Sequence, residues 1–185
     1  MRVTLLLLML VASSCVAAGQ TNSRLMLSDI VSERAARVPD ARQCARESLS
    51  LKEGDGDAAM GGVRATDYVI TNTSSSPCTL NGYPRVELMN RQGLIQKRAA
   101  NSDQLPDDNE KLPPRLVLLE PGKTAWFRVY FNAGGAGHVG KPCPTYPRSK
   151  ITLPGVTRAF VLRSEIQSCR GTDFRVSSLR SGMPQ

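Results

Sequence analysis

The sequence predicts an all-β fold, either a sandwich or a barrel, and three observations support this prediction. Short apolar or alternating segments recur from residue 44 onward, separated by turns rich in glycine and proline, a pattern typical of such folds. Helical periodicity is almost absent from the same region. Four of the five cysteines also lie there, and an even number is consistent with a domain that contains two disulfides.

The predicted strands follow from runs of apolar residues or from alternation of apolar and polar ones. Turns are expected between them because Gly, Pro, Asn and Asp favour tight reversals of the backbone. The longest polar segment, residues 101–114, predicts a loop. The predicted strands are residues 48–51, 67–72, 85–89, 94–96, 116–119, 126–131, 150–153, 159–162 and 174–177.

Residues 1–18 predict an export signal. Arg2 precedes an apolar stretch over residues 3–12, which is too short to cross a bilayer as a mature helix and has the layout of a signal peptide. Two cleavage sites compete, because residues 16–18 are small and favour cleavage before residue 19, whereas residues 11–15 resemble a lipobox. In the second case, Cys15 would be the lipid-modified first residue. Both cleavage sites predict that the mature chain is exported to the periplasm, the cell envelope or the extracellular medium.

The remainder of the chain divides into an arm and a domain. Residues 19–43 are expected to form an N-terminal arm, partly helical or disordered, because apolar residues at helical spacing precede Pro39. Residues 44–180 are expected to form the β-domain.

The cysteine positions predict two disulfides. An exported chain would reside in an oxidising compartment, where disulfides persist. Cys44 precedes the first predicted strand and Cys78 follows the second, so an antiparallel hairpin would bring the two together at its open end. Cys143 and Cys169 flank another predicted hairpin in the same way. We therefore predict Cys44–Cys78 and Cys143–Cys169 among the three possible pairings.

The sequence contains no recognisable catalytic or metal-binding motif. His138 is the single histidine, which excludes a histidine pair, and it is expected to face solvent in a glycine-rich loop. Residues 54–57, Gly-Asp-Gly-Asp, lack the other ligands of a calcium loop and predict a hairpin turn. We therefore expect no enzyme activity, no metal and no cofactor. The alternative is a wall- or glycan-acting hydrolase that uses scattered carboxylates.

The strongest candidate for a binding surface is the predicted strand at residues 126–131. Its apolar alternate residues would face the core, and the opposite face would carry Trp126, Arg128 and Tyr130. Two aromatic rings and a cation are typical of surfaces that bind glycans or peptides. A competing interpretation buries Trp126 beneath the loop or the arm, with Arg128 reaching outward.

The net charge of +8 would favour an anionic partner such as an envelope polymer. The competing interpretation is a solvated surface, which the dispersal of the charges along the sequence favours. Nucleic acid is not an expected partner outside the cytoplasm, and the membrane is expected only through an N-terminal lipid anchor. The sequence thus predicts a non-enzymatic, secreted or envelope-anchored domain that binds an envelope protein or an anionic envelope or glycan polymer.

Several motifs together resemble one bacterial family of exported domains. These are residues 71–84, which end in Pro-Cys-Thr-Leu-Asn-Gly-Tyr-Pro, residues 119–125, which begin with Leu-Glu-Pro-Gly, Cys143 ahead of Ile-Thr-Leu-Pro at residues 151–154, and Cys169 ahead of residues 174–177. They resemble the domain of unknown function 4232 over about residues 44–179. The resemblance implies an immunoglobulin-like antiparallel β-sandwich with disulfides and a signal peptide or lipobox. It assigns no catalytic residue.

Overall fold

The computed structural model describes residues 41–58, 62–104, 111, 113–134, 142–169 and 173–184. The predicted signal peptide, Cys15, most of the predicted arm and His138 lie outside the described residues. Within those ranges, no helix is long and apolar enough to cross a membrane.

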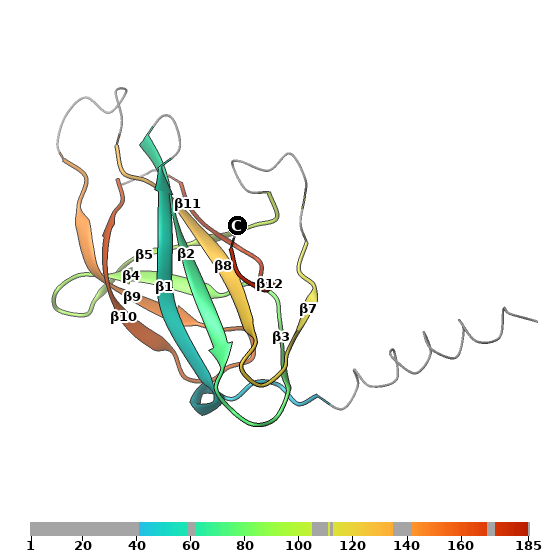
Figure 1. Ribbon diagram of the computed structural model, residues 1–185. Helices are drawn as coiled ribbons and strands as arrows, with labels where there is room; N and C mark the ends of the chain where they lie inside the picture. The colour runs from blue at the N-terminus through green and yellow to red at the C-terminus, as the bar shows by residue number, and fades with distance from the viewer. Residues whose placement is uncertain are drawn as a thin grey trace, which may run out of the picture. The chain divides into compact units, whose positions relative to one another are not determined.

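The described chain is almost entirely β-structure, as the sequence predicts, and its strands form two large sheets and a small one (Figure 1). A short 3-10 helix, η1(Arg46–Ser48), precedes the first strand. The first sheet has the order β1(Leu49–Ala58), β2(Val63–Asn72), β8(Thr124–Asn132), β11(Phe174–Ser177), β6(Ala100–Ser102), and β12(Arg180–Ser181) also pairs with β8. The second sheet has the order β10(Phe160–Gln167), β9(Thr145–Thr152), β4(Arg85–Met89), β5(Ile95–Arg98). The small sheet pairs β3(Cys78–Asn81) with β7(Leu116–Leu119).

The two large sheets share one hydrophobic core, which makes the fold a β-sandwich. Tyr68 and Phe127 of the first sheet are fully buried, and their rings stack with centroids 5.2 Å apart. Leu88 and Ile151 of the second sheet are fully buried in the same cluster. The alternation of apolar and polar residues along the strands therefore supplies the inner faces of both sheets, and burial of these side chains is the main stabilising contribution.

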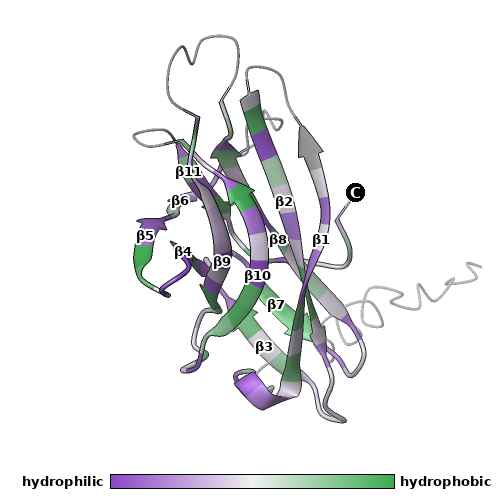
Figure 2. Cartoon of the chain, turned by 90° about the vertical axis from the view of Figure 1, so that its left-hand side faces the viewer, coloured by the Kyte–Doolittle hydropathy of each residue, from purple (hydrophilic) through white to green (hydrophobic). Residues whose placement is uncertain are grey.

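The outer strands of the two sheets meet along one side of the sandwich. β1 ends the first sheet and β10 ends the second, and the two lie side by side in both views (Figures 1 and 2). They are not hydrogen-bonded to each other as neighbouring strands of one sheet. This side of the molecule is hollowed, as described below.

The predicted hairpin turn at residues 54–57 is wrong. β1 continues to Ala58, and its pairing with β2 shifts register between Glu53 and Gly56. A Cβ atom on Gly56 would lie 3.1 Å from the Ala65 carbonyl oxygen. Glycine therefore allows two backbones to approach closely at this bulge.

The sheets are not wholly antiparallel, contrary to prediction, because β6 and β11 run parallel. β6 follows β5 after a single residue, Ala99. The chain thus passes from the second sheet to the first without reversing direction, and this crossing determines the orientation in which β6 meets β11.

Both predicted disulfides are present, joining Cys44 to Cys78 and Cys143 to Cys169. β1 and β2 form one antiparallel hairpin, and β9 and β10 form another. Each bridge lies beside the open end of its hairpin, as the sequence predicts. Two disulfides are compatible with an extracytoplasmic location.

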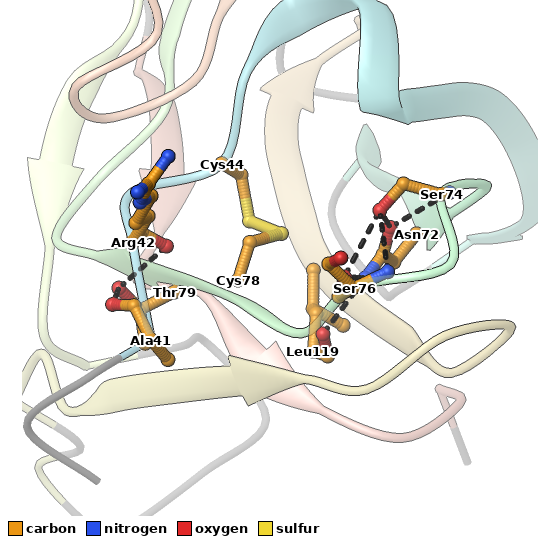
Figure 3. The surroundings of a disulfide bond; sticks show 9 residues. All are labelled: Ala41, Arg42, Cys44, Asn72, Ser74, Ser76, Cys78, Thr79 and Leu119. Atoms are coloured by element: carbon orange, nitrogen blue, oxygen red, sulfur yellow. Dashed lines mark hydrogen bonds between the residues drawn. A yellow bond between two sulfur atoms is a disulfide. The ribbon is translucent and has the colours of Figure 1, made fainter.

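Asn72 fixes the turn that leads from β2 to the first disulfide (Figure 3). It is fully buried, and its side-chain amide donates hydrogen bonds to the carbonyl oxygens of Ser76, at 2.8 Å, and Leu119, at 2.9 Å. Its Oδ1 atom accepts a hydrogen bond from the Ser74 backbone N–H at 3.0 Å. Asn72 therefore connects β2, the following turn and β7.

Candidate binding surface

The outward side of the second sheet carries a group of cationic side chains. In β4, Val86 and Leu88 are fully buried in the core, so Arg85 and Glu87 project from the opposite side of the strand. Residues directly opposite one another on neighbouring strands share a face of the sheet. By this register the outward side carries Arg85, Arg98, Arg148, Lys150 and Arg163, which we call the basic face.

The carboxylate of Glu87 lies among three of these cations. Glu87 is only 1% exposed, and one of its carboxylate oxygens lies 2.8 Å from Nε of Arg98 and 2.9 Å from Nη2 of Arg85. Nζ of Lys150 lies 3.8 Å from the other oxygen. The three cationic side chains cover the carboxylate while remaining 40–62% exposed themselves. One negative charge shared by three cations leaves this part of the face with surplus positive charge.

Arg148 and Arg163 add further positive charge and lie directly opposite each other on β9 and β10. Like charges in this arrangement destabilise a sheet. Arg148 donates a hydrogen bond to the backbone carbonyl of Arg91. The side chain of Arg163 forms no hydrogen bond or ion pair with any residue that the structure describes. A bound anion would relieve the repulsion between the two arginines.

A cleft of about 840 Å³ opens beside these two arginines. It lies on the side of the sandwich where the ribbons of β1 and β10 run next to each other (Figure 2). Both hairpins are irregular here, because the register shifts between Glu53 and Gly56 in β1 and between Arg163 and Ile166 in β10. We call this the bulge cleft. Its volume is in the range of small-molecule sites, and bulges are frequent next to such sites. Its lining consists of Glu53, Arg91, Pro147, Arg148, Arg163, Ser164 and Glu165.

The polar groups of the cleft and its surroundings differ in environment. The hydroxyl groups of Ser149 and Ser164 are buried and hydrogen-bonded to each other at 2.8 Å. Burial raises the pKa of the Glu53 carboxyl group. Burial, followed by the charge of Glu53, raises the pKa of Tyr68, which therefore remains protonated at neutral pH. Among the described residues, no group of three or more His, Cys, Asp or Glu side chains is placed to hold a metal ion.

The predicted surface on β8 has the expected alternation but is less exposed than expected. Phe127 is fully buried, whereas Trp126 is half-buried on the opposite side. Arg128 donates hydrogen bonds of 2.6 and 2.8 Å to the two carboxylate oxygens of Asp67, and this pairing raises the pKa of Arg128. Tyr130 is 4% exposed, contrary to the expectation of a surface residue. A binding role for Trp126, Arg128 and Tyr130 stays a prediction.

The basic face and the bulge cleft were not identified from the sequence, because their residues are far apart along the chain. A partial signal exists, since Arg85 and Glu87 on one strand, and Arg148 and Lys150 on another, are two residues apart and must share a face. The convergence of the strands depends on pairing between β4 and β9, which are separated by more than fifty residues. That pairing is not encoded in any local pattern.

Comparison with known families assigns this chain to one of them. A model of the family described as "Domain of unknown function (DUF4232)" matches residues 44–183. The match covers most of the sequence, so the chain belongs to this family. No match is found among curated proteins.

Proposed function

We propose that this protein is an exported, non-enzymatic binding domain that captures an anionic polymer of the cell envelope on its basic face. The observation that carries the proposal is the arrangement of five cations on one open sheet surface, where a single buried carboxylate, Glu87, is paired with three of them. The directly opposed Arg148 and Arg163 support it, because this pair costs stability unless an anion lies between or above the two side chains.

Export supports the choice of an envelope polymer as the partner. The N-terminal segment has the layout of a signal peptide, and the two disulfides persist best outside the cytoplasm. If Cys15 is lipid-modified, the domain is held at the membrane surface beside the polymer. Cleavage before residue 19 would instead release it.

The chemistry of the face fits a polymer with repeated carboxylate or phosphate groups. Guanidinium groups bind such anions through two parallel hydrogen bonds. Neighbouring strands lie about 4.8 Å apart, so the sheet presents its cations in closely spaced rows. Because the cations are exposed, salt screens their attraction for the polymer, and the affinity should fall as ionic strength rises.

The test compares two double variants of the full chain, both of which remove two positive charges. Arg85→Gln/Lys150→Gln weakens the basic face but leaves the 2.8 Å Arg98–Glu87 pair in place. Arg115→Gln/Lys123→Gln is the matched control, because both residues are exposed and lie outside the second sheet.

Calorimetry with polygalacturonate and with poly(glycerol phosphate) should show that at least one of these polymers binds to the unaltered chain. The face variant should weaken that binding about tenfold, equivalent to ~1.4 kcal/mol. Equal effects of the two variants, or no binding of either polymer, would refute the proposal.

A glycan hydrolase is the second candidate function, because the carboxyl-bearing residues Glu53 and Glu165 both line the bulge cleft. Burial raises the pKa of Glu53, which suits a proton donor. Incubation of the full chain with acidic and neutral oligosaccharides should then release new reducing ends, and Glu53→Gln or Glu165→Gln should abolish the release. Intact oligosaccharides after prolonged incubation with the unaltered chain would refute this candidate.

A further inference from the structure

We propose that the bulge cleft is a discrete site for an acidic sugar unit, a saccharide that bears a carboxylate or phosphate group. The inference rests on the proposed function and deepens it, because it assigns one unit of the captured polymer to a defined place. The cleft adjoins the basic face through Arg148 and Arg163, which belong to both. A polymer lying on the face could therefore direct one of its units into the cleft.

Three arginines in the cleft provide the site for the acidic group. Arg91 comes from the turn between β4 and β5, Arg148 from β9 and Arg163 from β10. The hydrogen bond from the Arg148 side chain to the Arg91 carbonyl oxygen holds one guanidinium group in place. Prior orientation of this kind reduces the entropy that is lost when a ligand binds. Guanidinium groups from three different segments can bind a carboxylate or a phosphate from more than one side.

Two carboxylates in the same cleft indicate that the ligand carries more than an acidic group. Glu53 and Glu165 line the cleft together with the arginines. An ionised carboxylate is solely a hydrogen-bond acceptor, so it would repel a simple inorganic anion. It would accept hydrogen bonds from the hydroxyl groups of a sugar. A ligand with both an acidic group and hydroxyl groups satisfies both kinds of side chain.

The shape of this side of the molecule favours a saccharide chain over an added peptide strand. β1 and β10 are edge strands, and edge strands can pair with an extended peptide. The bulges at Glu53/Gly56 and Arg163/Ile166 interrupt the regular row of backbone groups that such pairing requires.

Two smaller hollows continue along the same side and would hold neighbouring sugar units. One, of about 310 Å³, lies between residues 49–51 of β1 and residues 160–162 of β10. The other, of about 340 Å³, includes Gly56 of β1 and Gln167 of β10. Because the bulge cleft is lined by residues 53 and 163–165, the three hollows follow one another along both strands.

The experiment measures binding of short ligands to the full chain by calorimetry. The probes are trigalacturonate, an N-acetylglucosamine phosphate, neutral galactotriose and inorganic phosphate. At least one acidic saccharide should bind saturably and more than tenfold more tightly than galactotriose, and comparison of the first two probes distinguishes a carboxylate from a phosphate. Arg91→Gln should weaken that binding at least tenfold. Glu53→Gln should weaken binding of the acidic saccharide but not of inorganic phosphate.

The face variant Arg85→Gln/Lys150→Gln is the control, because neither residue lines the cleft. It should weaken binding of the long polymer more than binding of the short saccharide. If the polymer binds but no acidic saccharide saturates the chain, the inference is wrong and the proposed function stands. If the acidic saccharide binds while the polymer does not, the role of the basic face is wrong. If inorganic phosphate binds as tightly as the acidic saccharide, the cleft is a general anion site and the saccharide assignment is wrong.

Discussion

Replacement of Arg163 by glutamine should stabilise the fold while weakening its binding of an anionic polymer. Arg163 lies opposite Arg148 on the neighbouring strand. Within the described part of the chain, its side chain has no hydrogen-bond or ion-pair partner to lose. A residue kept for folding would show the opposite effect on stability. A gain in stability together with a loss of binding would therefore indicate that the charge of Arg163 contributes to ligand binding and not to folding.

The magnitude follows from the geometry of the pair. Directly opposed side chains have Cβ atoms about 5 Å apart, and we take the two guanidinium charges to be about 7 Å apart, since Arg163 can turn away from Arg148. Because Arg163 is exposed, a dielectric constant near that of water applies, and the repulsion is ~0.6 kcal/mol. Arg163→Gln should therefore raise the free energy of unfolding by about 0.5 kcal/mol, or the melting temperature by about 1–2 °C for a domain of this size.

The assay is urea unfolding and thermal melting of the full chain at low and high salt. The gain should shrink in 1 M salt, where the Debye length is about 3 Å. Arg163→Lys is the matched control, because it keeps the charge and should bring no gain. A loss of stability in Arg163→Gln, or a gain that salt does not change, would refute the electrostatic reasoning.

Three further predictions concern the core, the buried carboxylate and the turn after β2. Glu87→Gln should lower the free energy of unfolding by ~1–3 kcal/mol in urea titrations. This is less than the loss expected for a fully buried ion pair, because the cationic partners of Glu87 are 40–62% exposed. An unchanged urea midpoint would contradict this prediction. Phe127→Ala should cost ~3–5 kcal/mol, whereas Trp126→Ala should cost clearly less because Trp126 is half-buried; equal losses in parallel melts would show that Trp126 belongs to the core. Asn72→Ala should lower the free energy of unfolding by ~1–3 kcal/mol, because it leaves two carbonyl groups without their hydrogen bonds. A loss below about 0.5 kcal/mol, which is typical of a neutral surface substitution, would show that Asn72 does not fix this turn.

The parts of the fold that were predicted correctly depend on local patterns. The strands at residues 85–89, 116–119 and 174–177 match β4, β7 and β11, because apolar runs or alternation identify each without its neighbours. The disulfide pairs follow from the hairpins that they flank. The alternation along β8 correctly places Phe127 in the core and Trp126 on the opposite side.

The parts that were missed depend on contacts between distant segments. The glycines at residues 54 and 56 have the composition of a turn, but they permit close backbone approach at a bulge between β1 and β2. Strands β6 and β12 are only three and two residues long, too short for a periodic signal. Tyr130 is buried on a side of β8 where alternation predicts exposure.

The candidate binding surface illustrates the same limit. Arginines spaced widely along the sequence indicate a dispersed charge, yet the antiparallel register places Arg148 beside Arg163 and both near the turn that carries Arg91. Charge clustering on a sheet is a property of strand pairing and not of sequence windows. A prediction of pairing between β4, β9 and β10 would have been needed to find it.

The basic face is tested most directly by backbone-amide shift mapping with nuclear magnetic resonance, in which the isotope-labelled full chain is titrated with the anionic polymer that it binds. The largest shifts should fall on β4, β5, β9 and β10 around the basic face. They should extend to residue 53 in β1 and diminish as salt is added. Shifts centred on β8 and β12 around Trp126 would instead place the partner on the first sheet. That result, or the absence of any localised shift, would contradict the assignment of the basic face as the binding surface.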